Sequence, residues 1–400
     1  MTPPDETVVE RLVRSFDHLD PALDHTVLTE VYQRFATGCP VRSTDAHGGF
    51  KLVTRHDDIN DIARQPEAFS STPSVLHPVH EGRPPSIPIE FDPPAHPAYR
   101  KLFMDVLSAP QVKRVEPWLR ELTDRLLTDF IKGPELDFVH GVAAQLPIRA
   151  IGHLLGWGED ATEQMQEFAA TVLEHLGQPK MLEAFASLAA LATEEINDRK
   201  RNPRDDYLTK LIQTDFDGRP LTDDELLNIF RTFVFAGYET TTHALSSLIH
   251  HLAMHPELQE RLRADPALVN TAVEEGLRLF PPVQTMFRTV RTPTELRGVR
   301  LEAGDRLALL YGPANLDPQR FECPAEFRID RETARQHISF GAGAHYCAGA
   351  PLARAEMRIM LEALTTYPPY ELAGEPKYLP HLMMGQMMGV DYLPLRFAES

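Results

Sequence analysis

The longest helical pattern in the chain covers residues 222–253, TDDELLNIFRTFVFAGYETTTHALSSLIHHLA, where apolar side chains recur every three or four positions. At 1.5 Å per residue, a helix of about 32 residues is roughly 48 Å long. We therefore expect a helix that crosses the whole molecule, with the other elements packed around it. Further helical patterns occur at residues 113–133, 141–157, 163–177, 181–201 and about 349–367.

Strand patterns are short and lie toward the two ends of the chain. Residues 48–55, GGFKLVTR, alternate after a glycine pair, and short strands and turns follow residue 284. Residues 72–95 are rich in proline and lack a helical period, which predicts a long ordered loop, and such loops are usually functional. No repeat or linker interrupts residues 1–400. We expect one domain, mainly α with small β-sheets (α+β).

Composition argues against several classes of function. The chain has 58 acidic and 40 basic residues, a formal charge of -18, and no basic run that would indicate binding to nucleic acid or to an anionic membrane. It has no long uncharged apolar segment and no cationic leader at its N-terminus, so we expect a cytoplasmic protein that does not span a membrane. The scattered cysteines Cys39, Cys323 and Cys347 do not suggest a disulfide framework.

The segment 340–356, FGAGAHYCAGAPLARAE, places Cys347 among glycines, with His345 two positions before it. A dinucleotide-binding loop is excluded because Tyr346 stands where the third glycine is needed. A zinc site lacks a second pair of ligands nearby. A catalytic thiol with His345 as its base is disfavoured, because residues two apart in a tight turn generally do not converge on one proton.

Two interpretations of this segment remain open from its residues alone. One is a glycine-rich turn before an ordinary helix. In the other, Cys347 is a thiolate ligand of a metal in a bulky group. Gly341 and Gly343 would then let the backbone wrap closely around the group, and the helix that starts at Gly349 would favour the thiolate.

The pattern Phe-Gly-x-Gly-x-His-x-Cys-x-Gly at residues 340–349 resembles, position for position, the haem-ligand signature of the cytochrome P450 superfamily, in its soluble bacterial branch. The resemblance implies the cytochrome P450 fold, a triangular helical body with a long central helix over the haem. It implies haem b (iron protoporphyrin IX) as cofactor and Cys347 as the axial ligand of its iron. Phe340, Gly341, His345 and Gly349 are the further cofactor-binding residues that it implies in this segment.

The family also places an acid and an alcohol at a distortion of its longest helix, and AGYETT at residues 236–241 is similar to that motif. The resemblance implies that Glu239 feeds protons and that Thr240 holds the proton network at the bound oxygen. Gly237 weakens the helix by about 1 kcal/mol. The Thr240 hydroxyl can bond the carbonyl of Ala236, which would open the helix further.

Further motifs match the family in the expected order along the chain. Glu275 and Arg278 lie one helical turn apart, and the resemblance gives this pair a structural role behind the haem. The two haem propionates need cations, for which His96, Arg100 and Arg288 are the expected partners together with His345 of the cysteine segment. The family often has arginine where this chain has Leu316, so we expect altered packing there.

The substrate pocket is expected to be mostly apolar. Its predicted walls are Ile87, Ile89, Thr232, Phe235, Ala236, Val283, Gln284, Met286 and Met387. Gln284 is the only clear polar group among them, either orienting a substrate or bonding the backbone. His77 and His80 are either gate residues or solvent-facing histidines. The thioethers suit a hydrophobic guest of irregular shape.

The resemblance implies a monomeric monooxygenase that inserts one oxygen atom of O2 into a hydrophobic small molecule, with hydroxylation as the default and epoxidation or dealkylation as variants. Electrons would come from NAD(P)H only indirectly, through an external ferredoxin and its reductase, because no fused reductase is visible. A basic patch of Lys101, Arg354 and Arg358 is the predicted docking site. The alternatives are a peroxide-driven or non-oxygenating haem-thiolate enzyme, or a haem protein that binds or senses without turnover.

Overall fold

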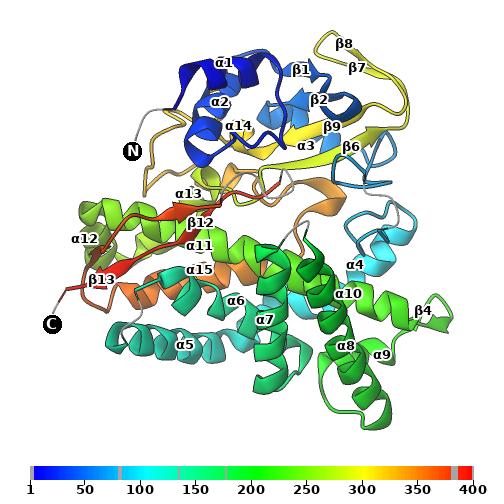
Figure 1. Ribbon diagram of the computed structural model, residues 1–400, viewed down its shortest axis with the longest axis vertical. Coiled ribbons are helices and arrows are strands. Elements are labelled where there is room, and N and C mark those ends of the chain that lie inside the picture. Colours follow the sequence, from blue (N-terminus) through cyan, green and yellow to red (C-terminus); the bar gives the residue numbers. More distant parts are fainter. Residues whose placement is uncertain (1–3, 80–82, 134–135, 176–177, 380–385, 399–400) are drawn as a thin grey trace.

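The computed structural model divides the predicted central helix in two (Figure 1). Helix α10 covers Asp223–Gly237 and α11 covers Glu239–Met254, with Tyr238 between them. A capping box formed by Thr222 and Glu225 starts α10. The two helices run one after the other through the middle of the molecule. The structure describes residues 4–79, 83–133, 136–175, 178–379 and 386–398.

Helices make up most of the body below and around α10 and α11 (Figure 1). They are α1 (Glu6–Arg14), α2 (His25–Thr37), α3 (His56–Ala63), α4 (Ala95–Leu107), α5 (Ala109–Lys132), α6 (Gln145–Leu155), α7 (Glu159–Glu174), α8 (Pro179–Arg201), α9 (Tyr207–Ile212), α12 (Pro256–Ala264), α13 (Val269–Leu279), α14 (Tyr311–Asn315) and α15 (Ala350–Leu364). Short 3-10 helices are η1 (Ala46–Gly48), η3 (Pro266–Leu268), η4 (Ala334–Gln336) and η5 (Gly343–His345), and η2 (Val139–Ala143) is a π-helix. The predicted helical segments all contain helices, with shifted ends.

The largest sheet lies at the other end of the molecule, beside α1 and α2 (Figure 1). Its strand order is β1 (Val41–Thr44), β2 (Phe50–Val53), β9 (Arg306–Leu310), β6 (Thr285–Val290) and β3 (Phe69–Ser70). Only the β2–β9 pair is parallel, with Leu52 opposite Ala308. The strands β4 (Asp215–Phe216), β5 (Arg219–Pro220), β7 (Thr294–Leu296), β8 (Val299–Leu301), β10 (Tyr370–Leu372), β11 (Lys377–Tyr378), β12 (Val390–Tyr392) and β13 (Leu395–Phe397) form two-stranded sheets.

Helix α11 is buried on every side over residues 241–250, although six of these ten residues are polar. A helix with no solvated face lies in the core of a large protein. Its polar side chains therefore need partners inside the protein: the Thr242 hydroxyl donates to the carbonyl of Tyr238, and a ring nitrogen of His243 meets the carbonyl of Val390. The sequence pattern alone predicts only that this segment is helical.

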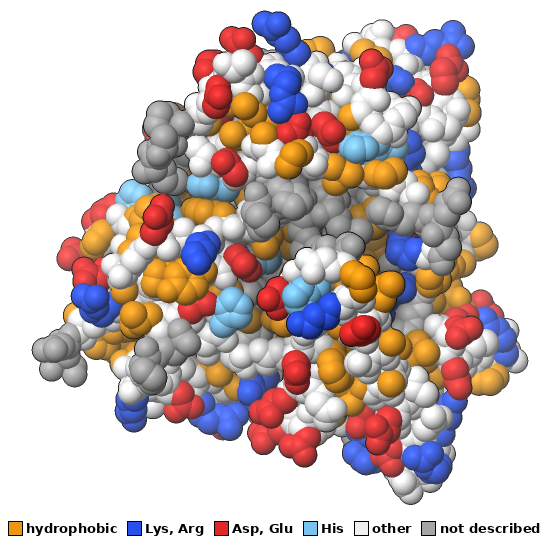
Figure 2. Space-filling model, viewed as in Figure 1, with side chains coloured by type: hydrophobic (Ala, Val, Ile, Leu, Met, Phe, Trp, Pro, Cys, Tyr) orange, Lys and Arg blue, Asp and Glu red, His pale blue; other side chains and the backbone are white. Residues whose placement is uncertain are grey.

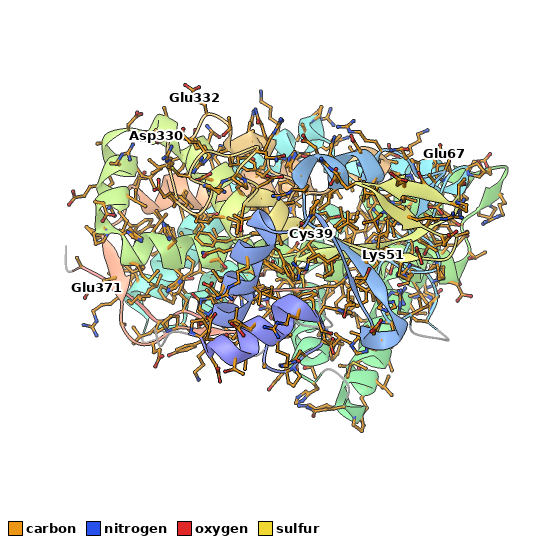
Figure 3. All side chains as sticks on the ribbon, turned by 90° about the horizontal axis from the view of Figure 1, so that it is seen from above. Cys39, Lys51, Glu67, Asp330, Glu332 and Glu371 are labelled. Carbon is orange, nitrogen blue, oxygen red and sulfur yellow. The ribbon has the colours of Figure 1, made fainter. Side chains whose placement is uncertain are left out.

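The surface and the cysteines agree with the predictions from composition. On the face seen in Figure 2, Lys and Arg side chains are scattered among Asp and Glu. The three cysteines are free thiols, and Cys39, labelled in Figure 3, lies just after α2. Lys51, also labelled there, ties β2 to Asp305 with a 2.6 Å ion pair. None of the helices in the described part of the chain is both long and apolar enough to cross a membrane.

Candidate active site

The loop that carries Cys347 is held by its own backbone and by α3. The amide of Cys347 donates to the carbonyl of Phe340 at 2.9 Å, which closes the loop before α15 begins. Gly341 and Gly343 both have positive φ angles, 70° and 66°, which favour glycine. A Cβ on Gly343 would lie 2.1 Å from the carbonyl oxygen of Ala63 in α3, whereas one on Gly341 would have 3.6 Å of clearance. Gly343 is therefore required for packing against α3, whereas Gly341 is favoured by its positive φ angle and not by a steric clash.

The Cys347 side chain is accessible although protein surrounds it, so its sulfur faces an internal space. Burial raises the pKa of the thiol, and the amides of Gly349 and Ala350 together with Arg100 and Arg354 act in the opposite direction. These donors and cations stabilise negative charge on the sulfur. They match what a thiolate ligand of a metal needs.

Phe340 is fixed by a cation above its ring. The guanidinium of Arg354 lies 4.5 Å from the ring centroid, and the same group donates to Glu274 at 2.8 Å. His337 also meets Glu274, at 3.1 Å. The predicted docking patch is therefore weakened, because Arg354 is neutralised by Glu274.

The other two residues of the predicted docking patch differ in whether they pair with acids. Arg358 pairs with Glu116 at 2.7 Å and with Glu362 at 3.1 Å, whereas Lys101 is exposed. Two of the three predicted patch residues are thus paired with acids, Arg354 with Glu274 and Arg358 with Glu116 and Glu362, which reduces the positive charge of the patch.

Four basic side chains lie beside the cysteine loop: His96 and Arg100 of α4, Arg288 of β6, and His345. The rings of His96 and His345 lie 4.2 Å apart, and Nε2 of His96 is buried without a hydrogen-bond partner. Arg288 is buried and bonds only the carbonyl of Phe287, and Arg100 donates to the carbonyl of Tyr346 at 2.6 Å. In the described structure, no carboxylate bonds any of the four.

The electrostatics of this group indicate a missing anion. Burial, reinforced by Arg288, His96 and Arg100, lowers the pKa of His345 to about 2. Burial and Arg100 lower the pKa of His96 to about 4. Burial also lowers the pKa of both arginines. Desolvated cations without a counter-charge destabilise a fold, so these residues fit a dianionic partner such as the two propionates of a haem.

The break between α10 and α11 has the predicted hydrogen bond. The Thr240 hydroxyl donates to the carbonyl of Ala236 at 2.7 Å, and this side-chain bond competes with the helical backbone bonds. A Cβ on Gly237 would lie 2.9 Å from Cδ1 of Ile151 in α6, so the glycine allows the two helices to approach. The helix ends at Gly237 and restarts at Glu239.

Glu239 is a partly buried acid without a hydrogen-bond or ion-pair partner in the described residues. Burial, and then the nearby Asp391, raises the pKa of its carboxyl to about 8. Since a proton donor or acceptor works best when its pKa is near the working pH, Glu239 is suited to proton transfer.

A cavity of about 1560 Å³ extends from this break toward the loop 72–95. Ile87, Ile89, Thr232, Phe235 and Ala236 line it, in agreement with the predicted walls, and so does His77. His80 lies outside the described residues. The sequence did not identify the wall that α8 supplies: Met181, Leu182, Phe185, Leu188 and Ala189. Nothing in its pattern distinguishes a helix over a cavity from one over a core.

Four predicted wall residues lie outside the lining of this cavity. Val283 and Met387 face each other in an isolated antiparallel bridge. Gln284 is buried and donates its amide to the carbonyl of Pro281, while Met286 lies in β6 with its sulfur 3.6 Å from the amide of Gln386. Gln284 is therefore not a polar group for substrate in this structure, because its side chain is used by the backbone.

The pair Glu275 and Arg278 is fully buried and part of a larger cluster. The two side chains bond at 2.7 Å, and Arg331 adds a second bond to Glu275 at 2.8 Å. Arg278 also donates to the carbonyls of Asn315, Pro324 and Glu326, and Phe321 lies 5.1 Å from its guanidinium. Arg331 was missed because it lies more than fifty residues from its partner and has no local spacing.

The segment with the departure from the family pattern is well packed. Leu316 lies against the apolar cluster of α1, α2 and the sheet, while its neighbour Asn315 bonds the amide of Ile338 and the hydroxyl of Ser339. Leu316 thus makes an apolar contact at the position where the family often has a polar arginine.

Comparisons with known proteins agree with this geometry. The cytochrome P450 family model matches residues 177–366. The chain is 34% identical to "Cytochrome P450 144" of Mycobacterium tuberculosis over 80% of its own length and 78% of the relative's. It is 31% identical to the "Steroid C26-monooxygenase" of the same species over 88% and 96% of the two lengths. The crystal structure of CYP108D1 from Novosphingobium aromaticivorans matches all of both chains with a TM-score of 0.84 and 28% identity.

Proposed function

The chain belongs to the cytochrome P450 family and is a P450 monooxygenase, and from this premise we propose that it hydroxylates a hydrophobic small molecule of steroid size or larger. The observation that carries the proposal is Ala236. This residue lines the cavity, and its carbonyl accepts the hydrogen bond from Thr240. Substrate space and the proton-handling side chains thus meet at one residue.

The residues around the cysteine loop fit a haem. Cys347 would hold the iron as its thiolate, and His96, Arg100, Arg288 and His345 would hold the propionates, since no carboxylate among the described residues bonds any of these four side chains. When bound, the haem supplies an iron centre that activates dioxygen for insertion of one oxygen atom into the substrate. Phe340 shields the sulfur and is itself fixed by Arg354.

The side chains at the helix break would supply protons. Thr240 places its hydroxyl beside the cavity, where it can give and accept hydrogen bonds, and Glu239 next to it exchanges a proton with the interior of the protein. Because the pKa of Glu239 is raised to about 8, the acid is largely protonated at neutral pH and can donate. The apolar walls of the cavity exclude water that would compete for these protons.

The size of the cavity supports a bulky guest. Its volume of about 1560 Å³ exceeds the ~300–1,000 Å³ common for small-molecule sites. The steroid C26-monooxygenase named above acts on a steroid by its name, another relative is named "Methyl-branched lipid omega-hydroxylase", and a similar structure holds erythromycin B. We infer a steroid, branched lipid or macrolide-like substrate for this chain.

Electrons are proposed to come from outside the domain formed by the described residues. These residues contain no flavin- or nicotinamide-binding segment, so a ferredoxin, reduced through its reductase by NAD(P)H, is the proposed donor. The free thiols of Cys39 and Cys323 suit a reducing cytoplasm.

The proposal is tested on the haem-loaded protein with a surrogate ferredoxin system. A panel of steroids, branched fatty acids and macrolides is first screened for compounds that shift ferric haem from low to high spin. With such a compound, we expect Thr240→Ala to keep the haem but to divert electrons from product to hydrogen peroxide, because the hydroxyl that manages proton delivery is lost. The measurement is product and peroxide formed per NAD(P)H consumed.

Thr242→Ala is the matched control, since Thr242 makes the same kind of bond but to the carbonyl of Tyr238, which does not line the cavity, whereas Thr240 bonds the carbonyl of Ala236, which does. Cys347→Ser should abolish the thiolate-type spectrum of the ferrous carbon monoxide complex. Unchanged product per electron in Thr240→Ala would refute the relay, and survival of the spectrum in Cys347→Ser would refute the ligand assignment.

A further inference from the structure

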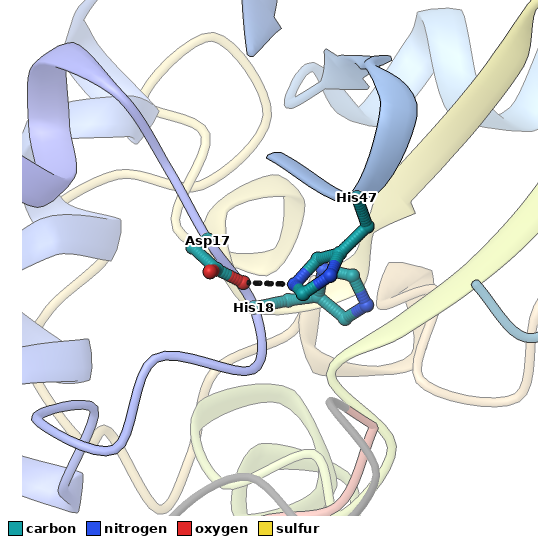
Figure 4. A group of neighbouring side chains, drawn as sticks. All are labelled: Asp17, His18 and His47. Atoms are coloured by element: carbon teal, nitrogen blue, oxygen red, sulfur yellow. Dashed lines mark hydrogen bonds and ion pairs between the residues drawn. The ribbon is translucent and has the colours of Figure 1, made fainter. Parts of the chain in front are cut away.

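A second group of ligand-type side chains lies far along the chain from Cys347, in the N-terminal part of the molecule (Figure 4). Asp17 and His18 belong to the segment between α1 and α2, and His47 belongs to η1 in the turn between β1 and β2. Each of the three offers one ligand atom, and these atoms lie within 4.8 Å of one another. Figure 4 shows the two imidazole rings crossing beside the carboxylate of Asp17.

His18 is set up as a metal ligand by its own hydrogen bond. Its Nε2 lies 2.6 Å from the carbonyl oxygen of His77, and because a carbonyl only accepts, Nε2 must carry the hydrogen. Burial lowers the pKa of His18, which favours the neutral ring. The nitrogen that His18 can offer is therefore Nδ1, as a lone pair.

That lone pair is unused inside the protein. His18 is only 1% exposed, and its Nδ1 has no hydrogen-bond partner in the described structure. A buried acceptor without a partner destabilises the fold, whereas a metal-bound histidine usually donates its other N–H to a carbonyl or carboxylate, as His18 does to His77.

The other two side chains complete a set of nitrogen and oxygen ligands. Nε2 of His47 lies 2.7 Å from Oδ1 of Asp17, and both side chains are about one-third exposed, so an ion can enter from solvent. An ordinary surface pair of His47 and Asp17 would explain this contact but not the bare Nδ1 of His18. Two histidine nitrogens and one carboxylate oxygen, with a fourth position left for water, are a ligand set that binds Zn2+ in proteins.

We propose that Asp17, His18 and His47 form a binding site for Zn2+ that is separate from the haem site. Zinc bonds of about 2.0–2.1 Å place tetrahedral ligand atoms about 3.3 Å apart. When the ion binds, the 2.7 Å pair of His47 and Asp17 therefore opens by about 0.6 Å, and the ligand atom of His18, which lies within 4.8 Å of the other two, approaches them by at most about 1.5 Å. The ion would join the segment before α2 to the β1–β2 turn.

The position of the site gives it a consequence for the cavity. Leu19 follows His18 directly, and Leu19 lines the cavity together with Leu76 and His77 of the loop 72–95. The carbonyl that orients His18 belongs to His77. Bound zinc therefore stabilises the part of the cavity wall where the N-terminal segment meets this loop.

The test is calorimetric titration of the haem-loaded protein with ZnCl2 at pH 7.5. We expect one saturable equivalent with micromolar or tighter affinity, and a rise in the thermal unfolding temperature with zinc. His47→Ala should weaken binding by about 10-fold or more and remove the zinc-dependent rise. Asp17→Asn, which keeps the shape of the side chain, should also weaken binding. MgCl2 should give no such binding, because Mg2+ prefers oxygen ligands.

His255→Ala is the matched control, since His255 makes a 3.0 Å pair with Glu257 on the surface, and although the ring of His251 lies 4.4 Å from that of His255, these side chains do not bring three ligand atoms within 4.8 Å of one another. This variant should bind zinc like the unaltered protein. The proposal is overturned if the unaltered protein shows no saturable zinc binding, if His47→Ala binds zinc equally well, or if His255→Ala loses as much affinity as His47→Ala. His47 and Asp17 are both accessible, so their replacement tests the site without emptying the core.

Discussion

Two buried glutamates in this molecule have opposite environments. Glu275 of α13 accepts hydrogen bonds from Arg278, Arg331 and the backbone of Arg328. Burial by itself raises the pKa of Glu275, but these partners outweigh it and the pKa is lowered. Glu239 at the start of α11 has no partner among the described residues, and burial with Asp391 raises its pKa to about 8.

The comparison shows that partners, and not burial, decide what a buried acid does. Glu275 keeps its charge at all physiological pH values and uses it to hold the loops that precede Cys347. Glu239 changes its protonation state near neutral pH, and perturbed acids of this kind gather at functional sites. If the two acids exchanged their surroundings, we would expect Glu239 to stay charged and Glu275 to change its protonation state near neutral pH.

The largest effect is expected at the paired acid. Arg278→Ala leaves Glu275 with one fewer cation and opens the bonds to the carbonyls of Asn315, Pro324 and Glu326. Removal of one member of a buried pair costs about 3–5 kcal/mol. We expect little or no folded, haem-loaded protein, measured by denaturant unfolding and by the Soret absorbance of the purified variant.

Arg328→Ala is the control for this prediction. The Arg328 side chain is partly exposed and pairs with Glu326, while only its backbone amide reaches Glu275. Its loss should cost less than about 1 kcal/mol. If Arg278→Ala and Arg328→Ala had equal stabilities, the buried cluster would not be what holds these loops.

The next largest effect is expected at the unpaired acid. Glu239→Gln removes the titrating proton and keeps the size of the side chain, so we expect kcat to fall by about 10²–10⁴-fold with the haem spectrum and stability little changed. The measurement is steady-state turnover with a compound found in the spin-shift screen.

Glu356 provides a matched control for this variant. It is also buried, has a carboxyl oxygen without a partner, and has a pKa raised to about 8 by burial. It lies in α15 and not at the break between α10 and α11, so Glu356→Gln should keep kcat. A similar loss of turnover in both variants would mean that a buried acid in general, rather than Glu239 at the helix break, matters for the rate.

The sequence predicts those parts of the site that depend on local spacing. The hydrogen bond from Thr240 to Ala236 and the pair of Glu275 with Arg278 each join residues within four positions of each other. The fold class was predicted from helical and strand patterns that are local in the same way. The break at Tyr238 follows from the same local motif.

Contacts between distant segments were not predictable in this way. Arg331 joins Glu275 from another loop, and Glu274 takes Arg354 out of the predicted docking patch. Gln284 is an error of another kind: it was expected in the pocket because of its type, yet its side chain donates to the carbonyl of Pro281, only three positions before it. These outcomes depend on which backbone groups lack partners after folding, and no local pattern records that.

The smallest effect is expected from removal of the negative charge of Asp391, which adds to the effect of burial on the pKa of Glu239. The carboxylate of Asp391 raises the pKa of Glu239, after burial. Asp391→Asn removes this negative charge, so the pKa of Glu239 falls and its proton is lost at a lower pH. The alkaline limb of the kcat profile should therefore move to lower pH, by less than about one unit because Asp391 is exposed.

The measurement is kcat between pH 6 and 9.5, and Asp330→Asn, the same charge change on another exposed aspartate (Figure 3), should leave the limb in place. A limb that stays in place in Asp391→Asn, or moves to higher pH, would show that a group other than Glu239 controls the rate. Since burial is the larger cause, most of the raised pKa should remain in Asp391→Asn, and the contrast with Glu275 should narrow without disappearing.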